Sequence, residues 1–189
     1  MKVRFEKPGN MLNPTPVVMV GCGTREKPNI ITIAWAGTIC SDPPMVSVSV
    51  RKERFSHDLI EKSGVFTVNL VDRALLRACD YCGVKSGRDT NKFADCHLTP
   101  AYGEETDAPM IEESPVSMEC RVKQMLELGT HDMFLGEIVS VYADEKYFDE
   151  HGAFHLEKTD LVAYSHGRYQ PLGEILGTFG FSVRKRPKK

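Results

Sequence analysis

Two cysteines three positions apart are the first residues in this chain whose type and spacing suggest chemistry. Cys79-Asp80-Tyr81-Cys82 has the spacing of a thiol redox pair or of one half of a zinc site, and Cys96-His97 could supply the other half. The second half lacks the residues that normally separate two zinc ligands. A zinc-stabilised interaction module on these four side chains is therefore kept as an alternative only, and the chain is expected to hold no metal.

A buried helix accounts for the same two cysteines without any chemistry. Asp72 is a residue type that often caps a helix, and apolar or thiol side chains follow it at helical spacing up to Gly83. These side chains are Leu75, Leu76, Cys79 and Cys82. The spacing predicts a helix over 73–82 with both thiols on its buried face.

Other short motifs do not carry the chemistry that they first suggest. Gly21-Cys22-Gly23 lacks the third glycine of a dinucleotide-binding loop, and Arg25-Glu26-Lys27-Pro28 cannot open the helix that such a loop needs. His151 and His155 are four residues apart, but Gly152 disfavours the helix that would align them as metal ligands. The sequence contains no Walker loop, nucleophile elbow or HExxH zinc motif.

The elements that must position any site are mostly strands. Seven segments are rich in β-branched or aromatic residues and are bounded by Gly, Pro, Asn or Asp. They are 17–20, 30–35, 45–50, 65–70, 116–128, 133–142 and 161–164. Besides 73–82, only 56–63 has helical character, with Ser56 as a candidate cap. The pattern predicts an antiparallel β-barrel with helices packed outside it.

Two connections stand out between these strands. Asp42-Pro43-Pro44 forms a stiff turn between the second and third segments. Residues 83–115 are rich in Gly, Asp, Thr and Pro and show little periodicity, which indicates a long surface excursion of the kind that is often functional.

Length and composition fit one globular domain. The 189 residues are 41% hydrophobic and 26% charged, which excludes collagen-like, coiled-coil and disordered classes. We expect a single domain over 1–183 and a basic, flexible tail over 184–189. No apolar run is long enough to cross a bilayer, and the first residues lack the apolar core of a signal peptide. We therefore expect a cytoplasmic protein, away from membranes, whose six cysteines are thiols.

The charge of the chain argues against nucleic acid as a partner. The formal net charge is −2, and five cations lie within the last six residues. They are Arg184, Lys185, Arg186, Lys188 and Lys189. Without these five the charge of the chain is −7. A body this acidic lacks the basic face that phosphate contacts need.

A series of short strings, in order along the chain, resembles the flavin reductase-like family, and within it the flavoredoxin-like branch. The strings are Asn29–Thr38, Asp42-Pro43-Pro44, Val46–Arg51, Arg54-Phe55-Ser56-His57, Ser86-Gly87-Arg88-Asp89, Lys92-Phe93, His131–Glu137 and Gly167-Arg168-Tyr169. Each is weak alone, but their order and spacing span most of the chain. The resemblance implies an FMN-binding split β-barrel of Greek-key type.

The phosphate of FMN needs hydroxyl and cationic donors. Ser47, Ser49 and Arg51 alternate onto one face of their predicted strand, and Ser56 lies at a predicted helix start, where free N–H groups attract anions. Under the resemblance these residues form a phosphate pocket that the long excursion closes through Ser86, Arg88 and Lys92. Without the resemblance, an ordinary solvent-facing strand is the favoured interpretation of the two serines, and a solvated charge pair that of Arg51 and Arg54.

The flat ring of FMN needs small residues beside exposed backbone. Thr32, Ala34, Ala36 and Thr38 share one parity in sequence, so a continuous strand would place all four on one face. Small side chains there would let the ring lie against backbone N–H groups. The alternative is a barrel wall packed by its neighbours. Trp35 has the opposite parity and covers either the core or an edge of the ring.

The full set of cofactor-binding residues that the resemblance implies is drawn from three regions of the chain. It comprises Asn29, Thr32, Ala34, Trp35, Ala36, Gly37, Thr38, Ser47, Val48, Ser49, Arg51, Phe55, Ser56, Ser86, Gly87, Arg88 and Lys92. His131 is the candidate catalytic residue. Many reductases of the family have Gly-Asp-His where this chain has Gly129-Thr130-His131-Asp132, so a role of His131 in nicotinamide binding stays open.

The resemblance implies an oxidoreductase, either an NAD(P)H:flavin reductase or a flavoredoxin-like protein that transfers electrons through bound FMN. NAD(P)H is then the expected electron donor, and a redox partner protein or free flavin is the acceptor. The chain is expected to form a homodimer with the flavin near the interface. A non-catalytic FMN carrier on the same fold is the alternative.

Overall fold

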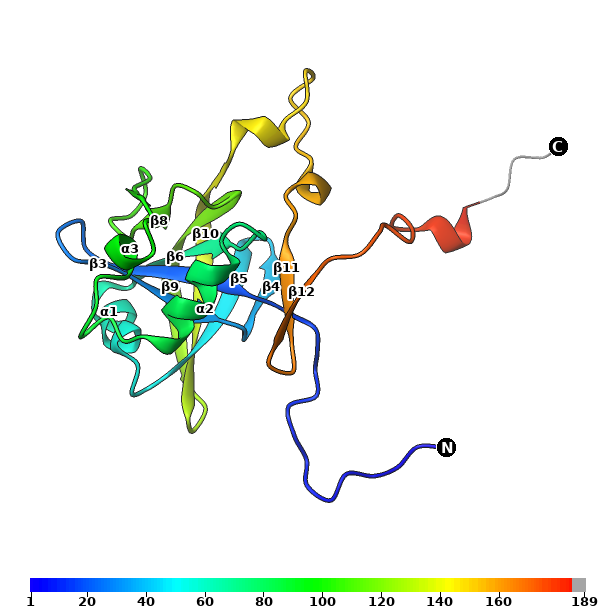
Figure 1. Cartoon of the computed structure of the whole chain (residues 1–189), viewed down its shortest axis with the longest axis horizontal. Helices are drawn as coiled ribbons and strands as arrows, with labels where there is room; N and C mark the ends of the chain where they lie inside the picture. Colours follow the sequence, from blue (N-terminus) through cyan, green and yellow to red (C-terminus); the bar gives the residue numbers. More distant parts are fainter. Residues whose placement is uncertain (185–189) are drawn as a thin grey trace.

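A computed structural model describes residues 1–184 and shows a β-sheet body with short helices packed against it (Figure 1). The strands are β1 (Thr15–Pro16), β2 (Val18–Gly23), β3 (Pro28–Ile33), β4 (Ala36–Ser41), β5 (Pro44–Arg51), β6 (Val65–Leu70), β7 (Pro100–Ala101), β8 (Met110–Ile111), β9 (Val116–Glu127), β10 (His131–Ala143), β11 (Val162–Ser165) and β12 (Arg168–Pro171). The α-helices are α1 (Phe55–Ser63), α2 (Leu76–Val84) and α3 (Lys92–Asp95), and three 3-10 turns lie at Glu145–Tyr147, Leu156–Lys158 and Phe181–Val183.

Seven strands form one antiparallel sheet in the order β3-β2-β6-β9-β10-β5-β4. The long strands β9 and β10 lie in its middle, and their register shifts twice, once between Leu135 and Gly136. Such bulges bend a strand and increase its twist, which curls the sheet. Gly136 also makes room for a neighbour, because a Cβ there would lie 2.5 Å from the Phe66 ring.

The two edge strands of this sheet, β3 and β4, are consecutive in the chain. Only Ala34 and Trp35 separate them, and the chain bends at these two residues. The Ser49 N–H donates to the Trp35 carbonyl at 2.9 Å, which fixes this bend to β5. The mainly β, antiparallel prediction is confirmed. The barrel, however, is not closed by a hydrogen-bonded ladder between β3 and β4 in residues 1–184; the covalent bend joins those edges instead.

This bend corrects the prediction of a strand over 30–35. β3 ends at Ile33 and β4 begins at Ala36, so Thr32 and Ala34 do not continue one strand face into Ala36 and Thr38. The predicted common face of these four residues is therefore wrong. β4 was missed because it lacks a run of β-branched residues, and the Asp42-Pro43-Pro44 turn lies within the β4–β5 hairpin.

The helices begin later or earlier than predicted. α1 begins at Phe55 with Arg54 as its N-cap, so Ser56 lies inside the first turn and does not cap the helix. α2 spans Leu76–Val84 instead of 73–82, and Asp72 accepts a hydrogen bond from the Leu75 N–H at 2.9 Å in the turn that precedes it. Cys79 and Cys82 are fully buried on α2, as predicted.

Two apolar cores lie on opposite faces of the sheet. One is enclosed by the curled sheet and α1, and it contains Val20, Val48, Phe66 and Phe134. The other packs β2 and β3 against α2 and α3 through residues such as Met19, Ile30, Cys79, Cys82 and Phe93. α2 and α3 are therefore held against β3, next to the bend.

A small second sheet lies beside the body. Its strand order is β1-β11-β12. The predicted strand 161–164 corresponds to β11, and β12 was not predicted. Residues before β1 and after β12 extend away from the body (Figure 1). Of the predicted tail 184–189, residues 185–189 lie outside the described part of the chain. None of the helices within 1–184 is long and apolar enough to cross a membrane.

Close backbone packing at Gly21 offers a test of the fold. A Cβ on Gly21 would overlap the Pro109 carbonyl oxygen and the Thr67 hydroxyl, whereas a Cβ on Gly37 meets nothing within 4 Å. Gly21→Ala should lower the free energy of unfolding by about 1–3 kcal/mol through overpacking. Gly37→Ala should change it by less than about 1 kcal/mol. Denaturant unfolding measures both, and equal effects would contradict this packing.

Candidate functional site

Three adjoining hollows form one groove around the bend between β3 and β4. The central hollow, about 450 Å³, is lined by β3, the bend, β5, the end of α2 and the β11–β12 hairpin. The cationic hollow, about 370 Å³, lies at the start of α1, and shares Ile31, Arg51 and Arg54 with the central one. The outer hollow, about 570 Å³, lies over β4 and β5 and shares Ala34, Trp35 and Ser49 with the central one. Ligand sites commonly have this size.

The cationic hollow has a lining of mostly positive charge. Its lining carries five cationic side chains and one carboxylate, Glu53. The cations are Arg51, Arg54, Lys85, Arg88 and Lys92. α1 points its N-terminus here, and its N-cap makes no side-chain hydrogen bond, so the first N–H groups of the helix are available to a ligand.

The arginines of this hollow have few competing partners. Arg51 forms a loose ion pair with Glu53 at 3.4 Å, and about half of its side chain is exposed. Arg88 donates to the Glu53 carbonyl at 3.1 Å and lies over the Phe55 ring. The Arg54 side chain makes no hydrogen bond or ion pair with any described residue. Arg54 is therefore the arginine of this hollow with the fewest partners competing with a ligand.

Buried polar contacts support the floor of the hollow. Lys92 is 3% exposed and its ammonium donates to the carbonyls of Ile30 at 2.7 Å and Cys82 at 2.8 Å, so it ties α3 to β3 and α2. Burial lowers the pKa of Lys92. Asn29 donates to the Ser56 hydroxyl at 2.8 Å, and a Cβ at Gly87 would overlap the Asn29 side-chain oxygen. Asn29 therefore supports the hollow from beneath, without lining it.

The central hollow has flat and aromatic walls. The Trp35 ring, 45% exposed, lies 4.5 Å from the His131 ring between centroids. On the other side the Tyr164 and Tyr169 rings pack edge to face, and Tyr169 donates its hydroxyl proton to Asp80 at 3.0 Å. Thr32 lines the same hollow and donates to the Cys79 carbonyl. A planar ligand fits between such walls.

The outer hollow is lined in part by predicted residues of β4 and β5. Ala36, Gly37, Ser47 and Ser49 line it together with residues 9–12 of the N-terminal segment. Ser47, Ser49 and Arg51 do share one face of β5, as the sequence predicts, opposite the buried Val46, Val48 and Val50. The Val48 side chain therefore lies in the core and Thr38 is exposed outside the hollows, so neither side chain lines the groove.

Several lining residues were absent from the predicted set. They are Val17, Ile31, Ile33, Glu53, Arg54, Asp80, Gly83, Val84, Lys85, Tyr164 and Tyr169. Arg54 could have been found, since it stands two residues before Ser56 in a string that carries the resemblance. The end of α2 and the β11–β12 hairpin reach the groove only through tertiary packing, which no local pattern signals.

The cysteines take no part in a metal centre within residues 1–184. The ligand atoms of Cys79, Cys82, Cys96 and His97 do not gather in threes in the described structure, which contradicts the zinc-module alternative. Burial raises the pKa of Cys79 and of Cys82 to about 12, so neither thiol ionises near neutral pH. All six cysteines are free thiols, as predicted.

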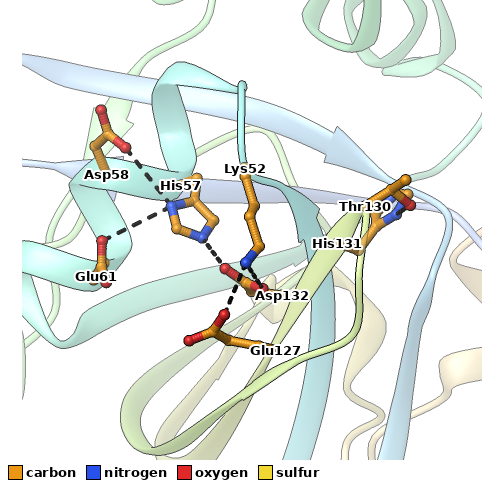
Figure 2. Close-up of polar contacts among 8 residues, drawn as sticks. All are labelled: Lys52, His57, Asp58, Glu61, Glu127, Thr130, His131 and Asp132. Atoms are coloured by element: carbon orange, nitrogen blue, oxygen red, sulfur yellow. Dashed lines mark hydrogen bonds and ion pairs between the residues drawn. The ribbon is translucent and has the colours of Figure 1, made fainter.

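A buried pair of residues next to His131 was not predicted. His57 on α1 and Asp132 on β10 are 75 positions apart, and His57 Nε2 lies 2.8 Å from Asp132 Oδ2 (Figure 2). Lys52 adds an ion pair with Asp132 Oδ1 at 3.3 Å. Burial acts to raise the pKa of Asp132, but the interactions with His57 and Lys52 outweigh it and hold that pKa below its usual value. The pair fixes α1 to the start of β10, beside the groove.

The family model described as flavin reductase like domain matches residues 11–173, so the chain belongs to the flavin reductase-like family, a flavin-binding family of oxidoreductases. The resemblance seen in the sequence is thereby confirmed.

Solved structures agree with this assignment. The flavoredoxin of Desulfovibrio vulgaris (Miyazaki F) is 35% identical, has a TM-score of 0.89, and the match covers 97% of this chain and 100% of that one. The flavoredoxin from Methanosarcina acetivorans is 30% identical, with a TM-score of 0.86 and the same coverage. An FMN-binding protein from Thermus thermophilus is 25% identical, with a TM-score of 0.78, over 94% of this chain and 98% of that one.

The charge on Arg51 should be measurable at His131. Burial and, after it, the Arg51 charge lower the pKa of His131 from its usual 6.5, so the imidazole is neutral at neutral pH. Arg51→Ala should raise the pKa of His131 towards that value, and Arg25→Ala, on a distant exposed ion pair with Asp107, should leave it unchanged. NMR titration of the imidazole protons measures the shift. A fall, or no change, in the Arg51 variant would contradict this electrostatic coupling.

Proposed function

We propose that the groove binds FMN, with the phosphate in the cationic hollow and the ring in the central hollow. The observation that carries the proposal is the sharp change of character along one continuous groove. One end presents five cations and the free start of α1, and the adjoining part presents aromatic and small residues with bent backbone. A ligand that is dianionic at one end and flat at the other matches both parts.

Fourteen of the seventeen predicted cofactor residues line this groove. Of the other three, Asn29 supports Ser56, while Val48 and Thr38 would contribute at most backbone. Arg54, Tyr164 and Tyr169 join the proposed set. The name of the Thermus thermophilus neighbour, an FMN-binding protein, supports the choice of FMN among flavins.

We propose further that the protein is an electron-transfer oxidoreductase. Bound FMN would supply the redox chemistry, taking electrons from NAD(P)H and passing them to a redox partner protein or to free flavin. The chain's own residues would bind the phosphate, orient the ring against Trp35 and limit its contact with water. His131 would stand beside the ring as a neutral group. A carrier that holds FMN without turnover is the rival on the same groove.

Arg54 tests the phosphate position. Arg54→Ala should weaken FMN binding by about 1.5–3 kcal/mol, roughly 10- to 100-fold, because a charge-assisted contact is lost. The fold should be unaffected, since this side chain has no partner among the described residues. Arg25→Ala, which lies outside the groove, is the matched control and should bind FMN as the native chain does. Fluorescence titration of FMN measures both affinities; equal affinities would exclude Arg54 from the phosphate site.

Reduction by pyridine nucleotide separates the reductase from the carrier. The FMN-loaded chain should lose its visible flavin absorbance when NADH or NADPH is added without oxygen. Stopped-flow absorbance measures the rate for each nucleotide. A flavin that stays oxidised with both donors would contradict NAD(P)H oxidation while leaving FMN binding intact, and would favour the carrier or reduction by a protein partner.

We also propose that the chain works as a homodimer. The terminal segments extend from the body (Figure 1). They expose large apolar side chains, among them Leu12, Leu176 and Phe179, and residues 9–12 line the outer hollow. Packed on a second copy, they would cover the open side of the groove.

Light scattering on the eluting protein should therefore give twice the chain mass of 21.2 kDa. Leu176→Asp combined with Phe179→Asp should shift the mass towards one chain, because charge opposes burial of these side chains in the interface. A single-chain mass for the native protein at high concentration would contradict the homodimer.

A further inference from the structure

A cluster on α1, on the side of His57 away from Asp132, has the arrangement of a metal-binding site. His57 Nδ1 lies 3.7 Å from Asp58 Oδ1 and 4.0 Å from Glu61 Oε2, and all three ligand atoms lie within 4.8 Å of one another (Figure 2). Atoms bound to one transition-metal ion at about 2.0–2.2 Å stand roughly 3–4 Å apart. The three side chains are therefore spaced to share an ion.

His57 supplies the second, independent observation. Its side chain is only 7% exposed, and its Nδ1 atom is buried without a hydrogen-bond partner among the described residues. An unpaired polar atom of this kind carries a cost that native structures normally avoid. Nδ1 faces Asp58 and Glu61 at distances too long for hydrogen bonds, which leaves space between them for a cation.

The other ring nitrogen fixes the orientation of the imidazole. Asp132 Oδ2 lies 2.8 Å from Nε2, and an ionised carboxylate can only accept, so Nε2 carries a proton and Nδ1 is the ring nitrogen left to face the two carboxylates as a ligand atom. A metal-bound histidine characteristically donates its second N–H to a carboxylate in this manner. Asp132 thus occupies the position of the supporting residue behind a ligand.

We propose that His57, Asp58 and Glu61 bind one divalent first-row transition-metal ion, with water in its remaining positions. One imidazole nitrogen and two carboxylate oxygens suit Mn²⁺, Fe²⁺, Co²⁺, Ni²⁺ or Zn²⁺ better than a thiol-seeking ion. The partial positive charge at the start of α1 opposes a cation, but two full carboxylate charges outweigh it. Arg88 competes for Asp58 only distantly, at 3.9 Å.

Mn²⁺ is the probe of choice, because it binds thiols poorly and its EPR signal is independent of flavin colour. The full chain, freed of unbound flavin, should remove one equivalent of Mn²⁺ from the free-ion signal near neutral pH, and Zn²⁺ should displace it. Glu61→Gln removes one ligand from a half-exposed position and should leave folding intact. It should weaken Mn²⁺ binding roughly tenfold or more.

Glu112→Gln removes the same charge from an exposed site elsewhere and serves as the matched control. It should bind Mn²⁺ as the native chain does. Two results would overturn the proposal: a native chain that takes up no saturable equivalent of Mn²⁺, as expected if a proton alone occupies His57 Nδ1, or a Glu61 variant that binds as tightly as the control.

Discussion

The site depends on one constraint, the two-residue bend that carries the chain from one edge of the sheet to the other. β3 ends at Ile33 and β4 begins at Ala36, so Ala34 and Trp35 must cross between strands that are not paired with each other. The hydrogen bond from the Ser49 N–H to the Trp35 carbonyl fixes that crossing to β5. The bend leaves backbone without a neighbouring strand, and this is where the central and outer hollows meet.

Electrostatics then distinguish the two ends of the groove. An acidic chain gathers five cations at the start of α1, among them Arg51 at the end of β5 and Arg54 on the short segment before the helix. Such clustering is unfavourable unless an anion occupies the space, since like charges repel. Lys92 shows how the fold accommodates one of these cations: its ammonium is buried, but two carbonyls accept its hydrogen bonds. The cationic hollow is thus organised before any ligand enters.

Features with a local period could be predicted from sequence. The common face of Ser47, Ser49 and Arg51 follows from the two-residue repeat of a strand, and the buried thiols of α2 follow from helical spacing. The bend could not be predicted, because Ala34-Trp35 carries no Gly or Pro and the flanking residues continue a strand pattern. The family resemblance predicted many of the residues that line the groove, but not those on the end of α2 and on the β11–β12 hairpin.

Contacts between distant segments could not be predicted from the sequence either, because no local pattern signals them. His57 and Asp132 are ordinary residue types 75 positions apart, and only the pairing of β5 with β10 brings them together. Tyr164 and Tyr169 come from a separate small sheet, which packs on the groove through its own core contacts. In each case the residue type alone carries no signal, and the burial that gives it a role arises from tertiary structure.

The central claim is that one groove recognises a phosphate at one end and a flavin ring at the other. Its most direct test compares the affinities of the native chain for FMN and for riboflavin, which has the same ring but no phosphate. The account predicts FMN binding tighter by roughly 100-fold or more, as expected when two or more charge-assisted contacts are made. Equal affinities would show that the cationic hollow takes no part in flavin binding and would contradict the account.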